Sequence, residues 1–239
     1  MARYAEHDLT NIFDVAKKFR DNCLMCDGSL LFDGAFVWRP DVLNRLHRAF
    51  VAEPDEGDRS FIVKFKDQIG NSGQDVIRLA AEILCVYFLF PSNVGGARKR
   101  QVVNEVLRWT DDNLPETNQV GIGSGGQGYN TRRPLEIAFM IDLVIAWKGL
   151  PAEQQAVVAA TASEFQQFVD SIKDAESKQL RHVLLYLLFP DHFERIASSN
   201  HKRRIIKAFS GLVSSEEVDE DSAILAIRCE LVKLLPNQQ

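Results

Sequence analysis

The clearest chemical function that this sequence indicates is the binding of an anion by three short clusters of basic residues. They lie in ARKRQ, YNTRRP and NHKRRIIK, each near a point where an apolar helical pattern begins. Backbone amides point outward at the start of a helix, and together with nearby cations they suit a phosphate or an acidic side chain. A neighbouring tyrosine can also stack on a base. The predicted contacts to DNA or phosphate are Arg98, Lys99, Arg100, Tyr129, Arg132, Arg133, His201, Lys202, Arg203, Arg204 and Lys207.

The cluster at residues 201–204 raises a problem of its own, because positive charge is unfavourable where a helix begins. A serine or asparagine at residues 198–200 can cap this helix and place the cations in its first turn. Asp191 and Glu194 are close in sequence and could pair with the two arginines inside the protein. The sequence leaves both outcomes open: the cations are neutralised internally, or they are available to an external anion.

The segment GIGSGGQG at residues 121–128 has the glycine spacing GxGxxG of a dinucleotide-binding turn. That motif needs a preceding strand and a helix that starts directly after it. Here no strand is predicted, the next apolar helical pattern starts near Pro134, and the lysine of a P-loop is absent. We therefore interpret the segment as a flexible or anion-binding loop rather than as a nucleotide cradle.

Common catalytic and metal-binding motifs are missing from the sequence. It contains neither HExxH nor GxSxG, and the CxxC pair of Cys23 and Cys26 has no second pair to complete a zinc site. Asp191 follows a proline as in some metal-dependent nucleases, but no acidic residue stands two positions before a lysine further along the chain. We expect a protein without enzyme activity, cofactor or metal.

The composition limits the class of protein. With 46% hydrophobic and 26% charged residues the chain is typical of a soluble globular protein, and its net charge of -5 argues against generic adhesion to nucleic acid. It has neither an apolar run of roughly 18 to 20 residues nor the residue order of a signal peptide at its start. We expect a cytoplasmic protein with no membrane partner and with reduced cysteines.

The elements that must position these clusters are mostly helices. Apolar residues repeat at helical spacing through most of the chain, and three segments are apolar enough to be buried helices: residues 76–91, 134–149 and 178–189. In residues 29–38, Asp33-Gly34 separates two short apolar runs, which predicts a β-hairpin. We predict a mostly α fold of about nine helices and one hairpin, as a single domain over residues 1–239 with an alternative sub-boundary near 110–133.

The order of several segments resembles a known family. AAEILCVYFLFP, GYNTRRPLEIAFMIDLVIAWK and, most distinctively, LLFPDHFERIASSNHKRRI resemble the region that precedes the ATPase module in bacterial McrB-type AAA+ proteins of restriction and anti-phage defence. The resemblance extends from about residue 20 to about residue 210. No Walker motif occurs in the 239 residues, so the resemblance implies an N-terminal recognition region, or a stand-alone relative, without ATPase activity.

In that family such regions generally recognise the target, often DNA, while the AAA+ ring acts with a partner nuclease. The resemblance assigns no binding residue. It therefore implies a non-catalytic recognition module, which we predict to bind DNA through the basic clusters. The alternative is a module that binds a partner nuclease, an AAA+ module or another subunit and does not bind DNA.

Overall fold

The computed structural model describes residues 10–115, 120–213 and 219–235. Within them the chain is 68% helical, with twelve α-helices and no strand, so the predicted α class is confirmed. The α-helices are α1 (Thr10–Lys18), α2 (Pro40–Leu46), α3 (Phe61–Ile69), α4 (Gln74–Phe88), α5 (Gly96–Leu107), α6 (Gly126–Thr131), α7 (Arg133–Gly149), α8 (Ala152–Ala160), α9 (Ala162–Asp170), α10 (Gln179–Leu188), α11 (Ser199–Ala208) and α12 (Glu220–Leu234). Five short π or 3₁₀ turns are η1 (Phe19–Leu24), η2 (His47–Val51), η3 (Arg108–Thr110), η4 (Ala175–Ser177) and η5 (Ser210–Leu212).

The described residues form twelve α-helices instead of the predicted nine or so, partly because one long stretch with an amphipathic helical pattern forms two helices. Residues 152–170 form two helices, α8 and α9, that meet at Thr161. Its backbone is extended (φ -134°, ψ 151°), and its side chain accepts a hydrogen bond from the backbone amide of Glu164. A threonine in this conformation is an N-cap, which begins a new helix instead of continuing the old one.

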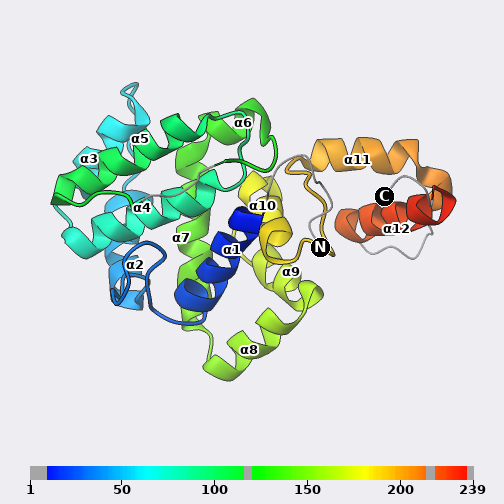
Figure 1. Cartoon of the computed structure of the whole chain (residues 1–239), viewed down its shortest axis with the longest axis horizontal. Helices are drawn as coiled ribbons and strands as arrows, with labels where there is room; N and C mark the ends of the chain where they lie inside the picture. Colours follow the sequence, from blue (N-terminus) through cyan, green and yellow to red (C-terminus); the bar gives the residue numbers. More distant parts are fainter. Residues whose placement is uncertain (1–9, 116–119, 214–218, 236–239) are drawn as a thin grey trace.

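Most of the helices form one body, which we define as residues 10–115 and 120–198. Its apolar core is continuous from Ile12 to Ala197, and the three helices predicted to be buried, α4, α7 and α10, run through it. The helix α2 packs on α4 and α7, α5 packs on α4, and α1 packs on α10 (Figure 1). Burial of apolar surface against these central helices is the main stabilising contribution.

The predicted β-hairpin at residues 29–38 does not form. The turn itself is present: Gly34 has φ 75°, and the backbone amide of Ala35 donates to the carbonyl of Phe32 at 3.1 Å. The flanking segments, however, do not form a strand ladder: the backbone amides of Val37 and Trp38 both donate to the carbonyl of Gly28, and the other main donors turn to the buried carboxylate of Glu82 in α4. The donors are the hydroxyl of Ser29, the backbone amides of Leu30 (2.8 Å) and Leu31 (3.1 Å), and the indole N–H of Trp38 (2.6 Å).

The buried carboxylate of Glu82 thus takes the place of a strand ladder. Burial raises the pKa of Glu82, and the donated hydrogen bonds oppose that shift. Because one carboxylate satisfies several donors of the loop, its two ends, with Ser29, Leu30, Val37 and Trp38, are buried without a strand ladder.

The helices α11 and α12 lie apart from the body, at the orange and red end of the chain (Figure 1). We call residues 199–213 and 219–235 the arm. Lys202 near the start of α11 pairs with Asp221 near the start of α12, and α12 also packs on α11 and η5, so the two helices lie side by side with their N-termini together. The buried apolar residues of α12, Ala223, Ile224 and Ile227, are not part of the core of the body.

Candidate anion-binding groove

The structure buries three of the predicted DNA contacts, Lys99, Tyr129 and Lys202. Lys99 lies in the first turn of α5 and is 0% exposed, and its ammonium donates to the carbonyl of Phe88 at 2.7 Å. It therefore satisfies a carbonyl at the end of α4, where a cation is favourable. Burial lowers the pKa of Lys99 to about 8. This prediction is corrected, because a buried side chain cannot reach a phosphate.

Tyr129 and Arg133 belong to an aromatic cluster inside the body. The rings of Tyr129 and Tyr87 stack with centroids 4.5 Å apart, and each hydroxyl donates to the backbone carbonyl of the other residue, at 3.1 and 2.8 Å. The guanidinium of Arg133 lies between 5.1 and 5.6 Å from the ring centroids of Phe61, Tyr87 and Phe88. Tyr129 is therefore unavailable to stack on a base, and Arg133 makes cation–π contacts instead of clamping a phosphate.

Lys202 is the centre of a buried network of charges that joins the arm to the body. Its ammonium forms an ion pair with Asp221 and a 2.9 Å hydrogen bond with Nδ1 of His182. Asp221 also accepts from Arg181 at 2.7 Å, and Arg181 binds Asp170 through two hydrogen bonds of 2.6 and 2.9 Å. Burial alone raises the pKa of Asp221, but the charges and hydrogen bonds of Lys202 and Arg181 outweigh it and lower the pKa.

This network shows that some cations at the start of α11 are neutralised inside the protein. The N-terminus of α12 carries acidic residues and lies beside the N-terminus of α11, so Asp221 pairs with Lys202 and Glu220 pairs with Arg203 at 3.6 Å. The internal partners are therefore the acids of α12 and not Asp191 and Glu194. Glu194 forms a 2.6 Å ion pair with Arg228 of α12.

His182 could suggest a nucleophilic site, because its Nε2 lies 2.9 Å from the hydroxyl of Ser199. Its Nδ1, however, faces the ammonium of Lys202 and the guanidinium of Arg181 and must accept. The proton is then on Nε2, which donates to Ser199 and cannot remove the proton of its hydroxyl. Burial, followed by the charges of Lys202 and Arg181, lowers the pKa of His182 to about 3. The histidine is a structural link and not a general base.

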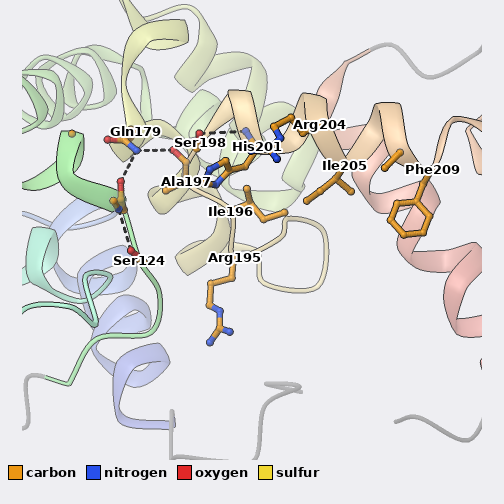
Figure 2. A pocket seen from close by; sticks show the side chains of 14 residues that line it. Ser124, Gln179, Arg195, Ile196, Ala197, Ser198, His201, Arg204, Ile205 and Phe209 are labelled. Carbon is orange, nitrogen blue, oxygen red and sulfur yellow. Dashed lines mark hydrogen bonds between the residues drawn. The ribbon is translucent and has the colours of Figure 1, made fainter.

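Two predicted residues lie together in a groove of about 740 Å³ between the body and the arm (Figure 2). His201 and Arg204 line it from α11, in helical register with Ile205, Ala208 and Phe209 on the same face. The opposite wall contains a glycine-rich turn, which we define as residues 124–128. The loop of residues 195–198 completes the groove.

Gln179 holds the glycine-rich turn against the loop. Its amide N–H groups donate to the carbonyl of Gly125 at 2.7 Å and to the carbonyl of Ala197 at 3.3 Å, as Figure 2 shows. Arg195 also reaches across, since its guanidinium donates to the carbonyl of Ile122 at 2.7 Å. The groove is therefore built on backbone that side chains fix in place.

The charges in the groove are of one sign. Among the described residues that line it there is no Asp or Glu, although the chain has 33 acidic residues and a net charge of -5. His201 and Arg204 form no ion pair with any residue that the structure describes. An anion that entered the groove would meet the guanidinium of Arg204, which the described part of the protein does not neutralise, beside the imidazole of His201.

The remaining predicted residues are exposed but do not line the groove. Arg98 bonds with the side-chain oxygen of Gln101 at 2.8 Å in the first turn of α5, and Arg203 pairs with Glu220. The exposed residues outside the groove are Arg98, Arg100, Arg132, Arg203 and Lys207.

The sequence analysis interpreted residues 121–128 as a flexible or anion-binding loop but did not connect this segment with α11. It missed Arg195, Phe209 and Gln179, which complete the groove. A signal for Phe209 was present, because it follows Arg204 and Ile205 at helical spacing on one face. Arg195 and Gln179 had no comparable signal, since Gln179 bonds with Gly125, 54 positions away, and Arg195 bonds with Ile122, 73 positions away.

Among the described residues no three His, Cys, Asp or Glu side chains are placed to hold a metal ion. None of the described helices combines the length and the hydropathy that a membrane-spanning segment needs. No protein family, curated protein or solved structure matches this chain significantly. The functional proposal therefore depends on the residues of the groove and on their geometry.

Proposed function

We propose that this chain is a non-catalytic recognition module, similar to the regions that precede the ATPase module in McrB-type AAA+ proteins, and that it binds nucleic acid. The observation that carries the proposal is the groove, where His201 and Arg204 lie with no carboxylate among the described lining residues. Arginine and histidine at such a site suit phosphate oxygens, which accept hydrogen bonds and carry the negative charge.

A polyanion suits this site better than an isolated anion, because further cations are exposed near the groove. Ser92, shortly before α5, donates its backbone N–H to the carbonyl of Gly123, next to the glycine-rich turn. Arg98 is six positions after Ser92, so it lies within roughly 20 Å of that point by chain length. A nucleic-acid backbone has phosphates at regular intervals and can contact cations of both the groove and α5.

The test is fluorescence anisotropy with labelled DNA, single-stranded and duplex, at several salt concentrations. Arg204→Glu should weaken binding at least tenfold and reduce the slope of log K against log salt by about one, because one phosphate contact is lost. Arg204 has no ion pair in the described structure, so the variant should keep the melting temperature of the parent protein.

The matched control is Arg108→Glu. Arg108 is another exposed arginine without an ion pair among the described residues, and it follows α5 at the end opposite to Arg98. Equal binding by the Arg204 variant and the control, or no binding of DNA at low salt, contradicts the proposal. Titration of methylated and unmodified duplexes then measures any preference for a modified base.

A second candidate function is supported by the outer end of the arm, where large apolar side chains are exposed. Phe209 is 40% exposed, Val232 47%, Leu234 63% and Leu235 49%. An apolar surface of this kind is typical of protein contacts. If the module binds an ATPase or nuclease encoded beside it, the two proteins should co-elute in size-exclusion chromatography, and Leu234→Asp should abolish the co-elution without affecting DNA binding.

A further inference from the structure

The groove has two chemically different halves along α11. His201 and Arg204 lie toward the start of the helix, and Ile205, Ala208 and Phe209 follow toward its end (Figure 2). Ile196 adds a further apolar side chain from the loop. A phosphate would occupy the first half, but the second half offers nothing to a phosphate and suits a flat or apolar group.

The glycine-rich turn leaves open space on the facing wall. Gly126 has φ 72°, and a Cβ built on it would meet no atom within 4 Å. Gly128 lacks a side chain as well, and a Cβ there would meet only the side-chain oxygen of Gln179, at 3.4 Å. A ligand can therefore approach the backbone of this wall closely, in the volume that larger side chains would fill.

We infer that the groove receives an unpaired stretch of nucleic acid, with a phosphate at His201 and Arg204 and a base against Ile205 and Phe209. The inference rests on the proposed function and names the form of nucleic acid that the same site prefers. In a duplex the bases are stacked on each other and do not present their faces, so the apolar half of the groove would have no partner. In a single strand the base faces are available, and an exposed aromatic ring binds them with little dependence on sequence.

The size of the groove supports the same ligand. Its volume of about 740 Å³ is within the range of sites that enclose small ligands, which is about 300 to 1,000 Å³. A single strand can thread such a groove one nucleotide at a time. A double helix is too wide to enter and could contact only the rim.

Phe209 provides the decisive variant, because it acts through stacking and carries no charge. Its ring is 40% exposed, so Phe209→Ala should leave the fold intact, which circular dichroism and the melting temperature check. The experiment measures fluorescence anisotropy of a labelled oligothymidine of twelve nucleotides and of a labelled twelve-base-pair duplex. Binding of the oligothymidine should be at least tenfold tighter, and Phe209→Ala should weaken it about tenfold. Phe209→Trp keeps an aromatic face and should bind like the parent protein.

The duplex measurements separate this inference from the proposed function. If the duplex binds as tightly as the oligothymidine and Phe209→Ala changes neither, the inference is wrong while nucleic-acid binding stands. If neither nucleic acid binds and a labelled polyglutamate peptide does, the groove takes an acidic peptide and both proposals are wrong. Arg108→Glu, the control outside the groove, should change none of these affinities.

Discussion

The body and the arm of this protein each bury a lysine, but they accommodate its charge in opposite ways. In the body, Lys99 is 0% exposed, has no carboxylate partner among the described residues, and donates to the carbonyl of Phe88. Burial lowers its pKa to about 8, so that it loses its proton in mildly alkaline solution. In the arm, Lys202 is 1% exposed and pairs with Asp221.

The difference shows that different interactions stabilise the two regions. The body is stabilised by an apolar core, and a single buried lysine is tolerated there because its pKa can fall. The arm has few apolar residues to bury, and it is fixed to α10 by Arg181, His182, Lys202 and Asp221. Such bonds are directional, so we expect them to specify one orientation of the arm and thereby the shape of the groove.

The largest expected effect comes from Asp221→Ala, which leaves Lys202 and one guanidinium N–H group of Arg181 buried without their carboxylate. Loss of one partner of a buried ion pair costs about 3 to 5 kcal/mol. Hydrogen exchange should show that α12 loses protection while α4 keeps it. Equal loss in both helices would mean that arm and body unfold as one unit.

A control for that variant replaces both members of the pair by apolar residues, as in Asp221→Leu with Lys202→Met. Removing both charges leaves no unpaired ion between these two positions, so the double variant should recover most of the lost stability. Arg181 keeps its two hydrogen bonds to Asp170 in this variant.

The reverse perturbation is Leu84→Ala in the core of the body. Leu84 is 0% exposed, and its truncation should lower the free energy of unfolding by about 2 to 5 kcal/mol through lost burial and the cavity that remains. Because the arm is attached to α10 of the body, both regions should lose protection together in hydrogen exchange. Loss of protection confined to α4 would contradict the expectation that unfolding of the body also unfolds the arm.

Acidification should weaken the arm before the body. The pKa of His182 is about 3 in the folded protein and about 6.5 in the unfolded chain, so between these values the unfolded chain binds more protons. The free energy of unfolding should then fall by about 2 kcal/mol from pH 7 to pH 5 through this residue. His182→Gln keeps an acceptor for Lys202 and does not titrate, so denaturant unfolding of this variant should lack that part of the pH dependence.

Lys99 should act in the same direction, but at alkaline pH. Its pKa is about 8 in the folded protein against 10.5 for an exposed lysine, so the unfolded chain binds more protons between these values. The free energy of unfolding should rise by about 1 kcal/mol from pH 8 to pH 9. Lys99→Met should show no such rise in denaturant unfolding, and a rise equal to that of the parent protein would assign it to another group.

The smallest effect is expected for the exposed ion pair between Arg203 and Glu220. The side chains are 66% and 35% exposed, and the pair is 3.6 Å long. Arg203→Ala should change the free energy of unfolding by less than about 0.5 kcal/mol, since solvent screens such pairs. A loss comparable to that of the Asp221 variant would show that the exposed pair also holds the arm.

The sequence by itself determined the helical class and the three most buried helices, because apolar residues that recur at helical spacing define a buried face locally. It also indicated a turn at Asp33-Gly34 and an anion-binding role for the glycine-rich turn. The predicted hairpin failed because Glu82, about fifty positions away, takes the hydrogen bonds that a second strand would have taken.

Only the tertiary structure decided which cations are available. Lys99 and Lys202 look alike in the sequence to Arg100 and Arg204, since all four stand in basic clusters at helix starts. Their fates differ because helical rotation turns two of them toward buried acceptors and two toward the surface. Contacts between distant parts of the chain bring acidic residues of α12 to the cations of α11. Such contacts also form the groove between α11 and the glycine-rich turn, and local residue patterns carry no information about them.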